Sequence, residues 1–252
     1  MSKQAVLSSQ QPATSDQRRA TSNQTTRQLV NFLCYKMDAA WYRLPRAERR
    51  RGGEAFLHVV ERWQKELMIF TYSTLGLKTQ SDFLLWRIGE RPEQFTAMSA
   101  ECLATSFGAH ATVTHSLLSM TKRSTYVDKL DPEHQDQRLR IVPAQAKYLF
   151  VYPFVKTREW YGLSHEERQQ LMDAHIVVGN KYKSVKLHTT YSFGLDDQEF
   201  VVAFETDKPS VFLDLVMELR ETKASRYTLR DTPVFTCVRQ ELPDLLRSLG
   251  AL

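Results

Sequence analysis

The sequence lacks the features that mark membrane-spanning, secreted and dithiol-containing proteins. Within its 252 residues, no apolar run approaches the roughly 18 residues of a membrane span. The three cysteines, Cys34, Cys102 and Cys237, are widely spaced and form no CxxC pair, so neither a zinc knuckle nor a dithiol redox motif is indicated. A P-loop, a nucleophile elbow and a dinucleotide-binding fingerprint are also missing. We therefore expect reduced thiols, no membrane span and a cytoplasmic location.

The N-terminal segment, residues 1–27, differs in composition from the rest of the chain. It is rich in Ser, Gln and Thr and lacks the apolar stretch of a secretory signal. We predict a disordered tail, because so little apolar surface cannot offset the entropy lost on ordering. The whole chain carries a net charge of +5, but its Lys and Arg residues are scattered and no nucleic-acid motif is present. Nucleic acid is therefore not an expected partner.

Two parts of the chain repeat one pattern. Residues 71–77 read TYSTLGL and residues 190–195 read TYSFGL, and each is followed by an apolar run, at 82–86 and 199–204. Upstream of both, a Lys, a Trp-Tyr pair, a Leu and a Glu-Arg pair occur in the same order. This internal duplication indicates two units of roughly 100 residues each.

Each copy shows the same succession of structural signals. An extended apolar run, at 29–35 or 148–153, precedes a charged amphipathic helix, two strands, a second helix and a final strand. This β-α-β-β-α-β order is the ferredoxin-like pattern. We predict an α+β protein of tandem ferredoxin-like repeats at 28–123 and 147–252, with sheets packed face to face or closed as a dimeric α+β barrel and helices outside. The polar segment 124–146 is predicted to link the repeats.

The second copy carries the clearest signals for individual elements. Ser164 and Glu167 fit a capping box, and Gly179 is a candidate stop for the helix that follows. The elements expected after this helix are strands at 183–191, 199–205 and 234–238 and a helix at about 210–222.

One position distinguishes the two copies. Seven residues after the matched arginine, the first copy has Phe56 and the second has His175, on one helical face with Leu171, Met172 and Val178. Since the fold accepts an apolar ring at this position, His175 is a candidate ligand; a histidine merely packed against its neighbours is the alternative. A zinc site needs three or four protein ligands. A haem iron needs only one histidine, because the porphyrin supplies four nitrogens.

Several motifs of the second copy resemble those of the chlorite dismutase and coproheme decarboxylase family. The resemblance covers about residues 28–240 and implies a duplicated ferredoxin-like fold, a homo-oligomer that is commonly a pentamer, and an iron porphyrin, haem b or coproheme, bound in the C-terminal copy. The matching motifs are Tyr152-Pro153-Phe154-Val155-Lys156, Trp160-Tyr161, Glu167-Arg168, Leu171-Met172-Asp173-Ala174-His175 and Gly194-Leu195-Asp196-Asp197.

The resemblance also implies roles for particular residues. His175 falls on the proximal iron ligand, Lys156 on a lysine near the haem, and Tyr152 on the tyrosine that decarboxylases use as a radical relay to a propionate. Guanidinium groups suit propionates because they form two parallel charge-assisted hydrogen bonds. The residues expected to contact propionates are Lys156, Arg220, Ser225 and Arg138, with Arg140 as the alternative to the last. A strand-end lysine, a half-buried strand tyrosine and surface arginines are the structural alternatives.

Two positions depart from the family pattern. At the position that the resemblance matches to an arginine in chlorite dismutases and a glutamine in many decarboxylases, this chain has Leu187, twelve residues past His175. Leucine cannot donate a hydrogen bond to an oxychlorine anion or a peroxide. The adjacent His188 is predicted to point to the opposite face of its strand. Ala224 occupies the place of the proximal glutamate, which leaves the proximal hydrogen bond unassigned. Chlorite dismutation is therefore not expected.

These residues leave three candidate functions. The resemblance favours decarboxylation of iron coproporphyrin to haem b, with hydrogen peroxide as the second small-molecule substrate. A haem-b carrier or sensor with weak peroxidase activity is the first alternative, and it accommodates Leu187 and Ala224. The second alternative is a non-haem member in which the barrel has become a structural or interaction module. Porphyrin binding separates the last from the others, and turnover separates the first two.

Overall fold

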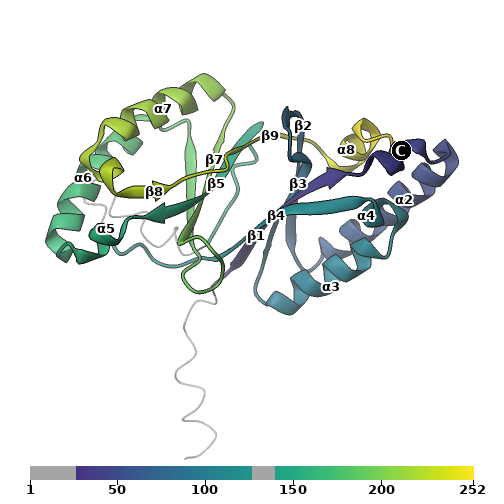
Figure 1. The fold of residues 1–252 in the computed structure, drawn as a ribbon, viewed down its shortest axis with the longest axis horizontal. Coiled ribbons are helices and arrows are strands. Elements are labelled where there is room, and N and C mark those ends of the chain that lie inside the picture. Colours follow the sequence, from purple (N-terminus) through teal and green to yellow (C-terminus); the bar gives the residue numbers. More distant parts are fainter. Residues whose placement is uncertain (1–26, 127–139) are drawn as a thin grey trace, which may run out of the picture.

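The chain forms two α+β halves that meet along their sheets in the computed structural model, which describes residues 27–126 and 140–252 (Figure 1). The N-terminal half consists of β1 (Leu29–Met37), α1 (Ala39–Arg43), α2 (Arg46–Trp63), β2 (Met68–Lys78), β3 (Ser81–Gly89), α3 (Pro92–Leu103), α4 (Ser106–Ala109) and β4 (Ala111–Met120). The C-terminal half begins with β5 (Tyr148–Lys156), α5 (Arg158–Gly162), α6 (His165–Lys181), β6 (Lys186–Tyr191) and β7 (Phe200–Thr206). It continues with α7 (Pro209–Glu221), the 3₁₀ helix η3 (Lys223–Tyr227), β8 (Thr228–Arg230), β9 (Phe235–Arg239) and α8 (Leu242–Ser248).

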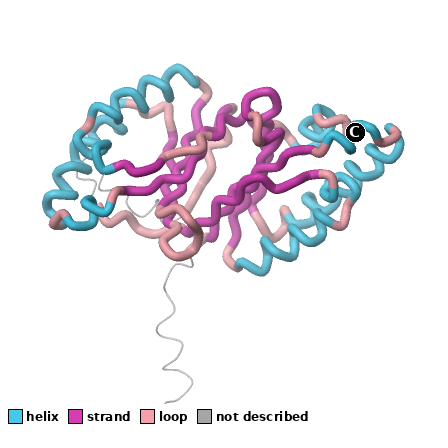
Figure 2. Tube along the Cα trace, viewed as in Figure 1, coloured by secondary structure: helices cyan, strands magenta, loops and turns pink. Residues whose placement is uncertain are grey.

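The strands of both halves join in one antiparallel sheet that closes on itself. Their order is β7-β6-β4-β1-β3-β2-β9-β5-β8, and an additional pairing of β7 with β5 completes a ring. The halves meet where β4 pairs with β6 and where β2 pairs with β9. The strands lie together in the middle and the helices on the two outer sides (Figure 2). The predicted α+β barrel of ferredoxin-like repeats is confirmed, and closure pairs the edge strands of the ring, so that the short strand β8 lies outside it.

The barrel interior is apolar because strand residues alternate between the two faces. The inward-facing cluster draws on strands of both halves and includes Val30, Phe32, Cys34, Tyr72, Leu84, Trp86, Leu149, Val151, Val201, Ala203, Phe235 and Cys237. Buried polar side chains lie in the same interior, among them His188, whose Nε2 donates to Glu205 Oε2 at 2.7 Å. The other face of each sheet is left to its helices.

The helix layer of the N-terminal half is filled by buried side chains. Helix α2 buries Gly52, Gly53, Phe56 and Val60 against the sheet. The segment after β9, assigned from the sequence to the second repeat, crosses to this layer, where α8 buries Leu242, Leu245 and Leu246. Trp41 Nε1 donates to the carbonyl of Leu249 at 2.9 Å, and a Cβ on Gly53 would approach the carbonyl oxygen of Ala251 to 2.2 Å. The C-terminal segment therefore completes the packing of the helix layer of the first repeat.

The helix layer of the C-terminal half is sparser. Among the described residues, its cluster of buried side chains comprises only Phe150, Phe204, Phe212 and Leu215. Helix α6, which is described over its whole length, contributes no fully buried residue. The layer beneath α6 is therefore less completely packed than the one beneath α2.

Helix α6 begins as its sequence predicts. Ser164 Oγ accepts from the amide of Glu167 at 3.2 Å, and Glu167 Oε2 accepts from the amide of Ser164 at 2.8 Å, so the capping box is present. The helix continues past Gly179 to Lys181, and β6 starts at Lys186 rather than at residue 183. No described helix is both long and apolar enough to cross a membrane.

Candidate functional site

His175 lies on α6, the helix whose layer is sparsely packed. Burial, together with the smaller effect of the positive charge of Lys156, lowers the pKa of its imidazole from 6.5 to about 4. The ring is therefore neutral at physiological pH. A neutral imidazole is the form that binds a metal ion through a ring nitrogen.

The strand register places Tyr152 and Leu187 on the helix side of the C-terminal sheet. Tyr152 of β5 is paired with Val202 of β7, and Leu187 of β6 is paired with Phe204, also of β7. Directly paired residues share a face, and Val202 and Phe204 both belong to the cluster beneath the helices. The space between the C-terminal sheet and its helices is thus bordered by Tyr152 and Leu187 on the sheet side and by helix α6, which carries His175, on the other.

His188 points the other way, into the barrel. It is buried against Trp86, with ring centroids 5.4 Å apart, and its Nε2 is engaged by Glu205. The expected opposition of neighbouring strand residues therefore holds, and His188 does not replace the missing polar group at Leu187.

Tyr152 is a partly buried phenol. Its ring stacks on Phe204 with centroids 6.0 Å apart. Burial raises the pKa of the Tyr152 hydroxyl well above its usual value; Asp231 raises it further, and Arg220 opposes the change. Tyr152 consequently keeps its Oη proton at neutral pH and would enter any reaction as a phenol.

Lys156 brings a partly desolvated cation to the same layer. Its Nζ donates to the carbonyl of Ala224 at 3.2 Å and lies over the ring of Trp160, 4.4 Å from the centroid. Burial lowers the pKa of Lys156 from 10.5 to about 8, partly opposed by Glu199. An ammonium in this environment is a favourable site for a carboxylate, which would restore the charged state that burial disfavours.

The other four residues predicted to contact propionates are placed differently. Arg220 forms an ion pair with Asp231 and has a side chain that is 58% exposed. Ser225 Oγ lies 2.6 Å from the carbonyl oxygen of Arg220 and 2.8 Å from that of Thr222, so its proton is used within its own turn. Arg140 lies 3.7 Å from Glu90 of the N-terminal half. Arg138 lies outside the described residues.

Comparison with known proteins identifies the family. The family model described as chlorite dismutase matches residues 51–240, which is most of the chain. The chain belongs to the chlorite dismutase family.

Two relatives and one solved structure show how far the similarity to this family reaches. The chain is 26% identical to a chlorite dismutase of Ideonella dechloratans, covering 88% of this chain and 79% of the relative. It is 29% identical to a coproheme decarboxylase of Mycolicibacterium smegmatis, covering 71% and 75%. A mutant chlorite dismutase of Candidatus Nitrospira defluvii superposes with a TM-score of 0.82 at 26% identity, covering 93% of this chain and 99% of that one. The similarity thus spans both halves.

Thr222 is the partner of His175 that sequence reasoning missed. The sequence puts Ala224 at the place of the proximal glutamate; this alanine is buried, and its backbone carbonyl accepts from Lys156 Nζ. In the structure, Thr222 Oγ1 lies 3.4 Å from His175 Nδ1. The available signal was a hydroxyl residue directly after helix α7, where a side chain can reach back to the neighbouring helix.

The residues of this layer fit a large apolar ligand held through one nitrogen. The described residues contain no cluster of three His, Cys, Asp or Glu side chains that would hold a bare metal ion. Leu187, with 51% of its surface exposed, presents an apolar side chain on the sheet face beneath the helices. His175 supplies a neutral nitrogen, and Lys156 supplies a cation at the same layer. These are the groups that an iron porphyrin with carboxylate substituents requires.

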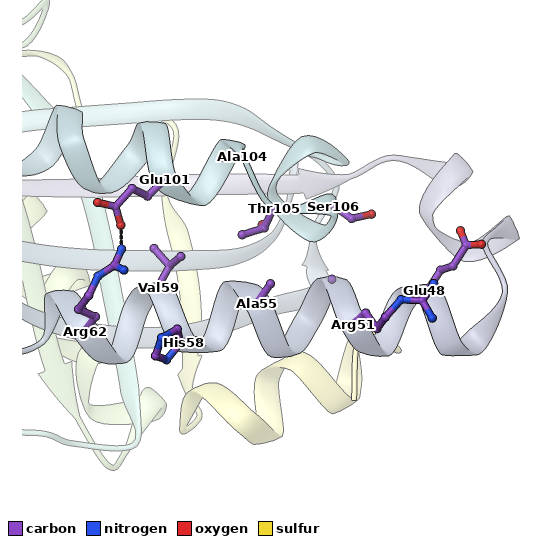
Figure 3. Close-up of a pocket in the computed structure, with 11 residues that line it drawn as sticks. Glu48, Arg51, Ala55, His58, Val59, Arg62, Glu101, Ala104, Thr105 and Ser106 are labelled. Atoms are coloured by element: carbon purple, nitrogen blue, oxygen red, sulfur yellow. Dashed lines mark ion pairs between the residues drawn. The ribbon is translucent and has the colours of Figure 1, made fainter.

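A separate groove of about 650 Å³ lies in the N-terminal half, between α2 and the α3–α4 segment (Figure 3). Figure 3 shows the ion pair of Arg62 with Glu101 spanning the groove. Its lining includes none of the residues predicted for the porphyrin site and consists of Glu48, Arg51, Gly52, Ala55, His58, Val59, Arg62, Glu101, Ala104, Thr105 and Ser106.

Proposed function

We propose that the C-terminal half binds an iron porphyrin and that His175 is its iron ligand. One observation carries the proposal: α2 fills its layer with the fully buried Phe56, whereas the matching helix α6 buries no residue fully and carries His175 instead. Membership of the chlorite dismutase family supports it, since a relative is a coproheme decarboxylase. The ligand would complete the layer that side chains leave incomplete.

We propose peroxide-dependent oxidative decarboxylation of coproheme as the reaction. When bound, the iron porphyrin would be both substrate and redox centre and would supply the chemistry with hydrogen peroxide. Tyr152, held against Phe204 with its Oη proton in place, would act as the radical relay to a propionate. Lys156 would orient a propionate carboxylate through its ammonium. Arg220 would contribute only if its ion pair with Asp231 opened.

A haem-b carrier or sensor with weak peroxidase activity is the second candidate. Leu187 favours it, because this side chain borders the layer opposite α6 and offers no hydrogen bond to a bound peroxide. The same feature argues against chlorite as a substrate, since an oxychlorine anion would find no donor at this position.

The deciding experiment is a titration of purified apoprotein with iron coproporphyrin and with haem b, followed at the Soret band, with His175→Ala beside it. Peroxide is then added and the product mass is followed, with Tyr152→Phe as the matched variant. We expect stoichiometric binding that is lost in His175→Ala, and the loss of two carboxyl groups that Tyr152→Phe slows at least roughly tenfold.

The other outcomes are equally informative. Binding without a change in mass would select the carrier or sensor. No protein-induced change of the Soret band with either porphyrin would overturn the porphyrin proposal and favour a structural or interaction module. The homopentamer and the cytoplasmic location stay predictions; sedimentation velocity of the full chain tests the first.

A further inference from the structure

Thr222 stands between His175 and the end of α7. Its Oγ1 lies 2.7 Å from the carbonyl oxygen of Leu219 and 3.4 Å from His175 Nδ1. Thr222 is the C-cap of α7 and also precedes η3, so its backbone is fixed on both sides. A hydroxyl in this place touches the one histidine proposed to bind iron.

The hydroxyl has only one proton, and its position decides the tautomer of His175. The shorter contact, to the carbonyl of Leu219, requires Thr222 to donate there because a carbonyl can only accept. Toward the imidazole the Thr222 oxygen is then an acceptor, so a hydrogen bond between them requires His175 Nδ1 to carry the ring proton. The lone pair is left on Nε2, which is the atom that would face the iron.

The turn that carries Thr222 is held rigidly. The amide of Thr222 donates to Leu219 O at 3.2 Å, and the amide of Ser225 donates to Thr222 O at 3.1 Å. Lys156 Nζ holds the same turn from the sheet by donating to the carbonyl of Ala224. Ser225 and Lys156 therefore fix the position of the Thr222 hydroxyl before any ligand arrives.

We infer that Thr222 is the positioning residue of His175 and that it makes the imidazole a weak electron donor. A carboxylate partner would draw the Nδ1 proton strongly and raise the basicity of the ligand; a neutral hydroxyl at 3.4 Å does so far less. Less electron density on the ligand favours ferrous over ferric iron. The first part concerns the apoprotein alone, and the second rests on the proposed function.

The first test uses the apoprotein without porphyrin. ¹⁵N NMR of labelled wild type, Thr222→Val and Thr222→Ser reports which nitrogen of His175 is protonated. We expect the Nδ1–H form in the wild type and in Thr222→Ser, and a mixture of both tautomers in Thr222→Val. An Nε2–H form in the wild type, or unchanged spectra in Thr222→Val, would overturn the positioning role.

The second test uses the porphyrin-loaded protein and has two readouts, the iron reduction potential and the ferrous iron–histidine stretching frequency. Thr222→Glu is expected to raise the ratio of the protein's affinity for the ferric porphyrin to its affinity for the ferrous porphyrin at least roughly tenfold. This change lowers the iron reduction potential by about 59 mV for one electron. The stretching frequency should rise in the same variant. Thr222→Val should weaken porphyrin binding roughly tenfold, with Thr222→Ser restoring it.

The outcomes separate this inference from the proposed function. Failure of the wild type to bind porphyrin would overturn the proposed function and the donor-strength part, while the tautomer measurement would still decide the positioning role. Tight porphyrin binding with an unchanged potential and frequency in Thr222→Glu and unchanged affinity in Thr222→Val would overturn the inference alone.

Discussion

The two helix layers of this molecule are built on one pattern and filled in opposite ways. In the N-terminal layer, Phe56 is fully buried and lies 4.8 Å from Phe107 and 6.5 Å from Phe83, measured between ring centroids. In the C-terminal layer, His175 is only partly buried, and Thr222 is its hydrogen-bonding neighbour. The difference teaches that one copy of a duplicated fold can fill its helix layer with side chains while the other leaves its layer less filled, as the proposed ligand site requires.

The segment after β9 adds to this difference in packing between the two helix layers. Helix α8 packs its leucines beneath α2, although it follows the second repeat in sequence. The N-terminal layer thereby gains apolar contacts, each buried leucine contributing roughly 1.5–3 kcal/mol relative to exposure. Nothing comparable covers α6 in the described part of the chain. We therefore expect unequal local stability in the two halves.

The largest expected effect is a loss of stability when a side chain is removed from the N-terminal helix layer, which Phe56 fills. Phe56→Ala should lower the free energy of unfolding by about 3–5 kcal/mol, because it opens a cavity among aromatic rings. His175→Ala should lower that of the apoprotein by less than about 1 kcal/mol, because its layer is already incomplete. Urea denaturation of both variants measures the contrast. Equal losses would show that the two layers are packed alike.

Porphyrin binding should then reduce the difference in stability between the two halves. At a porphyrin concentration of 100 Kd, binding stabilises the native state by about 2.7 kcal/mol. Hydrogen exchange should slow in α6 and α7 of the loaded protein and stay unchanged in α2. Slowing confined to the N-terminal half would place the ligand elsewhere, with the groove between α2 and the α3–α4 segment as the next place to look.

Lowering the pH should destabilise the protein through the C-terminal helix layer, which contains His175. The pKa of His175 in the folded protein is about 4, below its ordinary 6.5, so between these values the unfolded chain takes up a proton that the native apoprotein excludes. Stability is therefore lost as the pH falls from about 6.5 to 4, by roughly 1–3 kcal/mol in total. His175→Phe should lack this part of the loss. Parallel pH profiles of unfolding for the two proteins would contradict the assignment.

The smallest expected effect on stability is at Leu187. Leu187→Gln should change the free energy of unfolding by less than about 0.5 kcal/mol, because the side chain is half exposed. It should nevertheless increase peroxide consumption by the porphyrin-loaded protein, because an amide can donate a hydrogen bond where leucine cannot. Unchanged consumption would show that Leu187 does not face the reacting side of the porphyrin.

The sequence by itself determined the duplication, the order of elements and the contrast between Phe56 and His175. These are local or periodic features: the capping box at Ser164 fixes a helix start through neighbours three residues apart, and strand alternation decides that Leu187 and His188 face opposite ways. A pattern of this kind survives in the folded chain because it depends on backbone geometry alone.

Only the tertiary structure decided which side chains meet. Arg220 turned out to be paired with Asp231, Arg140 to lie near Glu90 of the other half, and His175 to have Thr222 rather than the residue at 224 as its neighbour. It also placed α8 on the first repeat. Such pairings join segments far apart in sequence, and they depend on ångström-scale packing and on competition among charged partners. No period or motif in the sequence encodes that competition.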